Sequence, residues 1–376
     1  MGDMATPQDS GAYRSPLLLR PGAVEATGID AGTAWHYGDP MGEQRAAETG
    51  AALFDRSNRS VLTVAGADRL TWLHTLTSQF LSTMADGQST QALILSPQGH
   101  VEHHFVVTDW RAVAVLDTEP AAGAALLTFL DGMRFWSKVE TADATGDLAV
   151  VTLAGPTAEG VLAAVFPQAG SATAAGPAAG GFARRTEEGI DLVIDRTRLA
   201  EVAALLITAG ATPAGSWAAD ALRIPTRRPR WGVDTDDRTI PNEVSWLQSA
   251  VHLEKGCYRG QETVARVYNL GRPPRRLVML NLDGSSGTLP ETGNAVISTQ
   301  GKIVGRVGTV AQHYEYGPVA LALVKRGVDV GTPLLVGSID TPIDAAIDPD
   351  DALAEADRAT PLSAIDRRAL SQIRRN

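Results

Sequence analysis

The sequence predicts an α+β protein with two mixed α/β domains and a small C-terminal antiparallel β-barrel. Strand-like and helix-like segments alternate over residues 35–220, and their order is similar in the two halves of that region, although no residue-level repeat connects them. Short strand-like segments separated by glycines follow from Arg276 onward. Alternation of this kind predicts mixed sheets covered by helices, and evenly spaced short strands predict a barrel.

The composition limits the classes of partner. The chain has 376 residues and a formal net charge of −10, and 44% of its residues are hydrophobic, so two or three packed domains are expected. The acidic charge disfavours nucleic acid and anionic membranes as partners, and no apolar run approaches the length of about 18 residues that a membrane span needs. The single cysteine excludes an internal disulfide, and the first 30 residues lack the order of a secretory signal. We expect a cytoplasmic protein whose partner is a small molecule or another protein.

The first α/β domain is expected at residues 35–145. A loose N-terminal leader with several prolines and glycines precedes it at residues 1–34. Residues 61–66 have the composition of a strand, and the apolar spacing after Asp68 predicts a helix whose stripe is interrupted at Thr77. The domain therefore begins with a strand followed by a helix.

A β-hairpin is predicted next in the same domain. Residues 91–95 and 101–108 are apolar runs that flank the turn sequence Ser96-Pro97-Gln98-Gly99. Proline, glycine and serine between two such runs favour a tight turn.

The second α/β domain is expected at residues 146–220, with an Ala/Gly-rich internal loop at 169–181 that has too little side-chain bulk to specify a core. Its composition predicts a strand, a helix, a strand and a helix at residues 148–153, 158–165, 189–194 and 199–209. A return segment at 221–272 follows it.

The barrel is expected at residues 273–340, before a polar tail at 341–376 that opens with an acidic segment. Five short strands are predicted in it, at residues 277–282, 295–298, 303–310, 319–324 and 334–336. Such a barrel pairs its own edges and can cover a neighbouring cleft.

The return segment carries the most informative motif, Lys255-Gly256-Cys257-Tyr258-Arg259-Gly260-Gln261-Glu262. It places the only cysteine between cations and between glycines, just before a predicted helix. A thiol reacts as its thiolate, which nearby cations and the start of a helix favour. We therefore take Cys257 as the candidate reactive residue.

Simpler interpretations exist for each residue of the motif. A lone cysteine is often a small buried hydrophobe, and Tyr258 is compatible with a core position. Lys255 is compatible with a solvated surface charge, and Glu262 with Arg266 at i,i+4 with an ordinary helix pair. The combination of two glycines, a cation, a thiol and a Gln-Glu pair within eight residues favours a functional site over mere packing.

The run from Lys255 to Arg266, with Pro241-Asn242-Glu243 before it and Arg276-Leu277-Val278 after it, closely resembles the signature of the YgfZ family. These proteins are folate-binding relatives of the glycine-cleavage T-protein (aminomethyltransferase) and are associated with iron-sulfur cluster assembly and repair. Further landmarks of the family, such as Phe54-Asp55-Arg56-Ser57, extend the resemblance over roughly residues 35–340.

The resemblance implies a GcvT-like three-part body in which two mixed α/β domains surround a central cleft that holds tetrahydrofolate. It implies folate as a partner, and iron-sulfur proteins or their assembly factors as protein partners. The site residues that it suggests are Cys257 as the catalytic residue, and Lys255, Gly256, Tyr258, Gly260, Gln261, Glu262, Arg266 and Arg223 as motif or cofactor-binding residues.

Two positions depart from the pattern of the relatives. T-proteins carry an acidic residue in the hairpin after a glycine, and His103 stands in that place here, with Glu102 beside it on the opposite face of the strand. After Arg223-Ile224, Pro225 replaces the acidic residue that relatives usually have. Carboxylates commonly hold pterin rings, so the change at Pro225 alters the expected folate pose, and Arg227, Arg228 and Arg230 can instead attract an anion such as a folate glutamate tail.

A metal site formed by this chain alone is not expected. Structural zinc or an iron-sulfur cluster needs about four protein ligands, whereas the motif region offers one thiolate with His252 five residues earlier. No Walker loop or GxGxxG sequence is present.

Three functions remain open from the sequence. The first is a folate-binding accessory protein for iron-sulfur cluster assembly or repair, with Cys257 as a reactive or transiently ligating thiol. The second is a tetrahydrofolate-dependent aminomethyl or methyl transferase or demethylase, which the missing hairpin carboxylate disfavours. The third is a non-catalytic module that binds folate or a protein.

Overall fold

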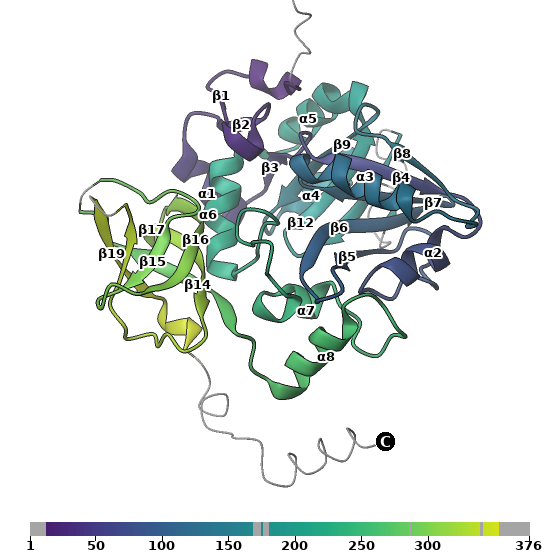
Figure 1. Ribbon diagram of the computed structural model, residues 1–376. Coiled ribbons are helices and arrows are strands. Elements are labelled where there is room, and N and C mark those ends of the chain that lie inside the picture. Colours follow the sequence, from purple (N-terminus) through teal and green to yellow (C-terminus); the bar gives the residue numbers. More distant parts are fainter. Residues whose placement is uncertain (1–12, 168–173, 176–179, 286, 339–340, 353–376) are drawn as a thin grey trace, which may run out of the picture.

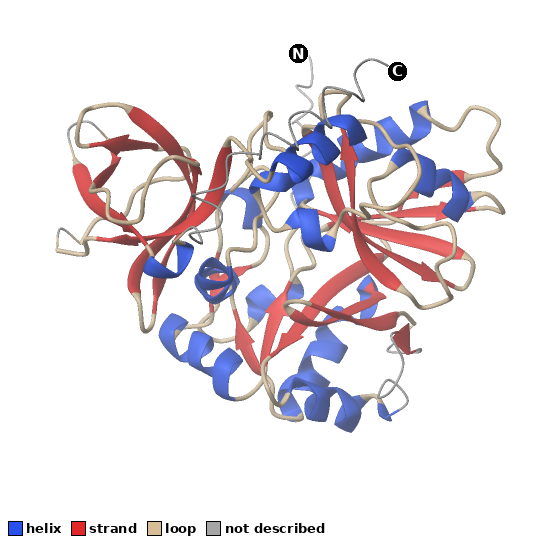
Figure 2. Cartoon of the chain, turned by 90° about the horizontal axis from the view of Figure 1, so that it is seen from below, coloured by secondary structure: helices blue, strands red, loops and turns tan. Residues whose placement is uncertain are grey.

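The computed structural model describes residues 13–167, 174–175, 180–285, 287–338 and 341–352. It shows the predicted α+β architecture, with two large sheets, their covering helices, a small two-stranded sheet and a closed barrel (Figure 1). Figure 2 shows the barrel to one side of the two sheets, with several helices on the outer sides of the sheets.

The first sheet has five strands in the order β5-β6-β7-β4-β8. The strands are β4 (Ser60–Ala65), β5 (Ser89–Leu95), β6 (Val101–Trp110), β7 (Val113–Thr118) and β8 (Glu140–Asp143). The strand at 61–66 and the hairpin of β5 and β6 are therefore confirmed.

Helices α2 (Arg69–Leu76) and α3 (Gly123–Gly132) cover one face of this sheet. Their apolar residues Leu73 and Leu126 pack with Ile94 and Phe105 of the strands in one buried core. Helix α2 ends where the sequence places a break, because Thr77 adopts an extended backbone.

The second sheet has six strands in the order β10-β11-β12-β9-β3-β13. The strands are β3 (Ala52–Asp55), β9 (Leu148–Ala154), β10 (Ala174–Ala175), β11 (Phe182–Thr186), β12 (Gly189–Asp195) and β13 (Thr212–Ala214), and the helices are α4 (Ala158–Val165) and α5 (Leu199–Thr208). All four elements predicted in the second domain are confirmed. Strand β3 precedes the first sheet in the chain but pairs with β9 in the second sheet. The second sheet therefore includes a strand from the region expected to form the first domain.

The two sheets pack against each other. Val61 and Val115 of the first sheet lie in one buried cluster with Val150, Phe182 and Val193 of the second. This contact fixes the walls of any cavity between the sheets.

The described part of the expected leader packs on the second sheet. Its elements are η1 (Pro16–Leu19), β1 (Val24–Glu25), η2 (Gly28–Asp30) and β2 (Ala34–His36), and α1 (Pro40–Thr49) follows. Leu17 joins the core of the second sheet, and the Tyr13 hydroxyl donates a hydrogen bond to Ser57 Oγ at 2.6 Å. Residues 1–12 lie outside the described residues, as does most of the Ala/Gly-rich loop.

The barrel has six strands in the order β14-β17-β16-β15-β18-β19. They are β14 (Arg275–Leu282), β15 (Ala295–Ser298), β16 (Ile303–His313), β17 (Gly317–Lys325), β18 (Leu334–Gly337) and β19 (Pro342–Ile347). The five predicted strands are confirmed, and the barrel extends beyond the expected boundary at residue 340 because β19 pairs with β14 and closes it. Ile343, Ala345 and Ile347 alternate into the barrel core.

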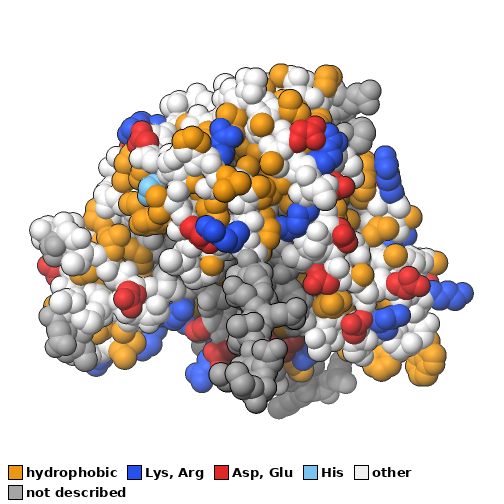
Figure 3. All heavy atoms as spheres, turned by 90° about the horizontal axis from the view of Figure 1, so that it is seen from above, with side chains coloured by type: hydrophobic (Ala, Val, Ile, Leu, Met, Phe, Trp, Pro, Cys, Tyr) orange, Lys and Arg blue, Asp and Glu red, His pale blue; other side chains and the backbone are white. Residues whose placement is uncertain are grey.

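The return segment connects the sheets to the barrel. Helix α6 (Ser216–Arg223) begins before the expected boundary at residue 221, and η6 (Ile224–Thr226), η7 (Pro241–Glu243), α7 (Trp246–Ser249) and α8 (Gln261–Leu270) follow it. Helix α8 confirms the helix predicted after the cysteine motif. Among the described residues, the helices are all too short or too polar to cross a membrane. On the face shown in Figure 3, acidic and basic side chains lie among hydrophobic ones.

Candidate functional site

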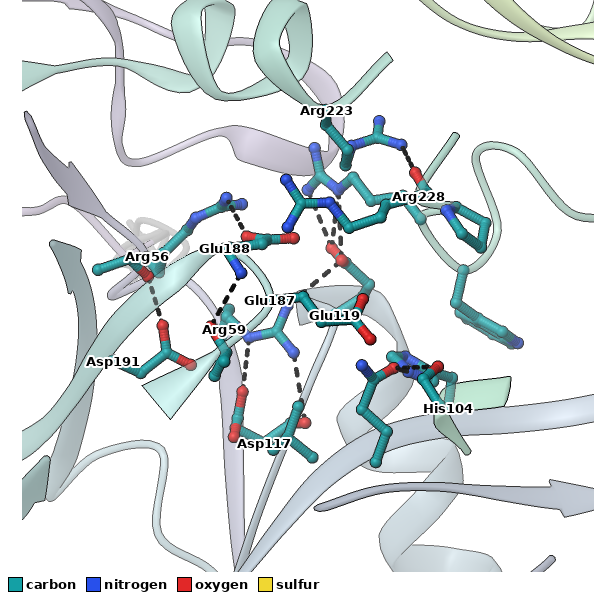
Figure 4. A pocket seen from close by; sticks show the side chains of 18 of the residues that line it. Arg56, Arg59, His104, Asp117, Glu119, Glu187, Glu188, Asp191, Arg223 and Arg228 are labelled. Carbon is teal, nitrogen blue, oxygen red and sulfur yellow. Dashed lines mark hydrogen bonds and ion pairs between the residues drawn. The ribbon is translucent and has the colours of Figure 1, made fainter. Parts of the chain in front are cut away.

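A charged cavity lies between the two sheets and the return segment (Figure 4). Its volume is about 100 Å³. Strands of both sheets, the turn between β11 and β12, the end of α6 with the segment after it, and α7 contribute to its lining. The lining residues include Arg56, Arg59, Gln91, His104, Asp117, Glu119, Glu187, Glu188, Asp191, Arg223, Arg228, Arg230, Trp231 and Trp246.

One wall of the cavity is fixed by buried ion pairs. Arg184 is fully buried, and its Nη2 lies 2.5 Å from Asp117 Oδ1 and 3.0 Å from Asp191 Oδ2. Arg59 Nε contacts Asp117 Oδ2 at 2.8 Å from the other side. Low dielectric strengthens such contacts and makes an unpaired partner costly, so these residues serve as a rigid wall.

Ion pairs with Arg230 and Arg59 keep the buried Glu119 ionised. Its Oε2 accepts a hydrogen bond from Arg230 Nη2 at 2.9 Å, and Arg59 lies 3.3 Å from its Oε1. Burial pushes the pKa of Glu119 upward, but Arg230 and Arg59 outweigh that effect and hold it at about 2. Glu119 is therefore a carboxylate at neutral pH, with its charge already compensated.

His104 and Trp246 form an aromatic wall. The rings stack with centroids 4.4 Å apart and an interplanar angle of 13°, and His104 Nε2 lies 2.9 Å from Gln91 Oε1. Burial, with a smaller effect of Arg59, lowers the pKa of His104 to about 4. The imidazole that lines the cavity is therefore neutral at pH 7.

His103 is predicted from the sequence to take the position where T-proteins carry an acidic residue. In strand β6, however, it is the next residue, His104, that faces the cavity. His104 lines the cavity, whereas His103 pairs with Ile94 on the face covered by α3 and lies against Phe129. Glu102 forms an exposed ion pair with Arg259 at 3.0 Å.

His103→Phe is expected to make the protein more resistant to mild acid. Burial and the charge of Arg259 lower the pKa of His103 to about 4, and its Nδ1 is buried without a hydrogen-bond partner in the described residues. The unfolded chain binds a proton near pH 6.5, so wild-type stability falls as the pH drops from about 6.5 toward 4. Between pH 7.5 and pH 5 the variant should avoid a loss of about 2 kcal/mol, as measured by urea unfolding. An equal loss of stability in both proteins would contradict this assignment.

Two charged groups in the cavity have no fixed partner. Within the described residues, neither Glu187 nor the terminal nitrogens of Arg228 form an ion pair, although Arg228 Nε donates to Thr226 Oγ1 at 2.9 Å. Arg227 and Arg230 are tied instead to Asp348 and Asp30, each at 2.8 Å. Of the three arginines near Pro225, only Arg228 therefore offers a guanidinium to a ligand in the cavity.

The predicted site residues fall in three places. Arg223 lines the cavity and is held there by Asp234 at 2.6 Å and Asp220 at 2.9 Å. Glu262 and Arg266 line a separate groove of about 740 Å³ beside the β5–β6 turn. The others are Lys255, Gly256, Cys257, Tyr258 and Gly260 in the loop before α8, and Gln261 at the first position of α8.

Cys257 is exposed in this loop and does not line the cavity. Lys255 is buried, and its ammonium donates to main-chain carbonyls. Tyr258 is buried in a cluster with Leu93 and Val264, and burial raises its pKa to about 12. The thiol and the cavity are therefore two distinct places on the protein.

The two motif glycines differ. Gly260 has φ +80°, and a Cβ on it would lie 2.5 Å from the Ser96 carbonyl oxygen in the turn between β5 and β6. Gly256 faces open space. Only Gly260 is required for close backbone approach, which joins the start of α8 to the hairpin.

The sequence interpretation missed several cavity residues. Glu187 and Glu188 lie in the turn between β11 and β12, and Glu188 pairs with Arg56 at 2.9 Å. Adjacent carboxylates in a tight turn are unremarkable by themselves, and only the packing of the two sheets places them opposite Arg228.

Comparison with known proteins gives consistent results. The family model described as the GCVT N-terminal domain matches residues 32–255. An aminomethyltransferase of Nostoc sp. is 30% identical over 323 residues, which cover 78% of this chain and 82% of that protein. An aminomethyltransferase of Herpetosiphon aurantiacus is 27% identical over 360 residues, covering 89% of this chain and 96% of that protein.

A solved structure has the same fold. The glycine cleavage system aminomethyltransferase T from Bartonella henselae superposes with a TM-score of 0.75 at 19% identity, covering 88% of this chain and 94% of that one.

Proposed function

This chain belongs to the GCVT N-terminal domain family, and from that premise we propose that it binds tetrahydrofolate in the cavity and serves iron-sulfur cluster assembly or repair in the cytoplasm. Cys257 is the thiol that meets the partner protein, as a reactive group or a transient ligand. Within this family we propose that the chain is related to YgfZ proteins, because it carries the motif from Lys255 to Arg266.

The donor set of the cavity suits a folate. Glu187 provides an untied carboxylate for the amino and NH groups of a pterin, and Arg228 provides an untied guanidinium for a carboxylate of the glutamate tail. Arg223 Nε is buried and lacks a hydrogen-bond partner in the described residues, and the Trp246–His104 wall offers a flat aromatic surface. Tetrahydrofolate, when bound, supplies ring nitrogens that accept one-carbon units. A folate exceeds the cavity volume of about 100 Å³, so its binding requires the cavity to widen.

The exposure of Cys257 carries the proposal for the thiol. The sulfur lies outside the cavity on a loop whose neighbouring residues are buried or bonded. A surface thiol suits a reaction with a second macromolecule, such as an iron-sulfur protein, because a protein surface cannot enter a small cavity.

The test is complementation of a strain that lacks this protein. Cys257→Ser is expected to lose the activity of iron-sulfur enzymes that the wild type restores, while its expression and thermal stability stay unchanged. Arg259→Gln is the matched control, because it removes a charge two residues away and keeps the thiol. Full iron-sulfur enzyme activity with Cys257→Ser would remove the thiol from the function.

A transferase is the second candidate, and the curated relatives favour it through their name, aminomethyltransferase. Against it, strand β6 presents His104 and Val106 to the cavity in place of a carboxylate. Formation of methylene-tetrahydrofolate from a methylamine donor by the purified protein would favour the transferase. Stabilisation by tetrahydrofolate with no effect of any motif substitution would instead indicate a non-catalytic binding module.

A further inference from the structure

The Lys255 side chain occupies an enclosed site of main-chain oxygens. Only 4% of the residue is exposed. Its Nζ donates hydrogen bonds to the carbonyls of His74, Thr77 and Gln79 at 2.6, 2.7 and 2.9 Å. These carbonyls belong to the last turn of α2 and the residues just after it, where a helix leaves carbonyls without partners and favours a cation.

The main chain of Lys255 closes the loop that carries Cys257. Its carbonyl accepts a hydrogen bond from Gln261 Nε2 at 3.3 Å, and its N–H donates to the His252 carbonyl at 3.3 Å. Downstream, Tyr258 is buried. The loop is thus held on both sides, with Gly256 and Cys257 exposed between the fixed points.

The ammonium has no donor left for the sulfur. A lysine ammonium carries three N–H donors, and three carbonyls accept from this one. Burial lowers the pKa of Lys255 to about 8, so the ammonium remains the main form at pH 7. The sequence suggested the opposite arrangement, in which this cation stabilises the thiolate.

We propose that Lys255 is a positioning residue whose ammonium ties the Cys257 loop to the end of α2, and that it does not act as the counter-ion of the thiolate. The importance of this tie for the cell rests on the proposed function of Cys257. The structural role of Lys255 does not depend on that function, so the structural role and the function of Cys257 are tested separately.

The first test is hydrogen exchange on the full chain. In Lys255→Ala, amides of residues 252–261 and 77–81 are expected to exchange at least about tenfold faster, because hydrogen bonds to a charged donor are lost there. Exchange in the barrel should stay unchanged. Lys325→Ala is the matched control, since Lys325 Nζ donates to a single carbonyl, that of Ile303, at an exposed site. A uniform increase over the whole chain, or no increase in the loop, would overturn the proposal.

The second test is chemical rescue. Lys255→Ala leaves a space shaped like propylammonium, and this ion is expected to restore slow exchange in the loop. Tetramethylammonium has the same charge but no N–H donors, so it should not restore it. Equal rescue by both ions would indicate a general salt effect and contradict the proposal.

The third test separates positioning from activation. The rate at which iodoacetamide alkylates Cys257 is followed against pH in the wild type and in Lys255→Met. His74, His252 and Tyr258 near Lys255 are the same in both proteins. We expect the two pH profiles to keep the same midpoint while the absolute rates differ. A midpoint shifted to higher pH in Lys255→Met would show that the ammonium acts on the thiolate. This outcome is independent of complementation by Cys257→Ser, so failure of the proposed function would leave it intact.

Discussion

Arg184→Met is expected to lower the free energy of unfolding by about 4 kcal/mol, because it leaves buried carboxylates without their cation. Arg184 is fully buried, and its guanidinium contacts both Asp117 and Asp191. After substitution Asp117 keeps its ion pair with Arg59, whereas Asp191 loses its ion pair and keeps the hydrogen bond from Thr152 Oγ1 at 2.7 Å. Urea unfolding at pH 7.5 measures the change.

The adjacent residue provides the control for this experiment. Arg185 pairs with Glu159 at 2.6 Å, but the two side chains are 39% and 54% exposed. Such pairs contribute at most about 1 kcal/mol, so Arg185→Met should have a small effect. Similar losses for the two variants would show that Arg184 does not hold the cavity wall as described.

Gly260→Ala is expected to destabilise the protein by about 3 kcal/mol, through a left-handed backbone and a close contact. The residue has φ +80°, and its Cβ would meet the Ser96 carbonyl oxygen at 2.5 Å. Relief of that contact requires the start of α8 to move away from the β5–β6 turn, and the Cys257 loop moves with it.

Gly256→Ala is the matched control, since a Cβ there meets open space. It is expected to change stability by less than about 0.5 kcal/mol. Thermal and urea unfolding measure the change in the free energy of unfolding for both variants. Equal effects would mean that the motif glycines are not distinguished by the contact with Ser96.

Elements defined by local patterns were predicted well from the sequence. Apolar spacing predicted α2, local composition predicted α4, and the turn Ser96-Pro97-Gln98-Gly99 predicted the hairpin of β5 and β6. Pairing between distant segments was not predicted, because nothing local in β3 specifies that it joins β9 in the second sheet. The strand β19 was missed inside a segment interpreted as a polar tail, although its alternation of Ile343, Ala345 and Ile347 is a strand signal.

The residues of the cavity also depend on pairing between distant segments, and of the site residues suggested by the sequence the cavity contains Arg223. Neighbouring residues of a strand face opposite sides of the sheet, but which of His103 and His104 faces the cavity depends on which side α3 covers. The sequence was compatible with Lys255 as a cation beside the thiolate or as a solvated surface charge, whereas in the structure it is buried with its ammonium at the end of α2. The orientation of His104 and the burial of Lys255 depend on contacts between residues that are remote in the chain, and a single sequence does not specify such contacts.

Calorimetric titration with tetrahydrofolate tests the central claim that the cavity and the exposed thiol are separate sites. We expect binding to the wild type, the same affinity for Cys257→Ala, and an affinity about tenfold lower for Arg228→Met, which loses a charge-assisted hydrogen bond. No binding to the wild type, or loss of binding in Cys257→Ala with Arg228→Met unaffected, would contradict it.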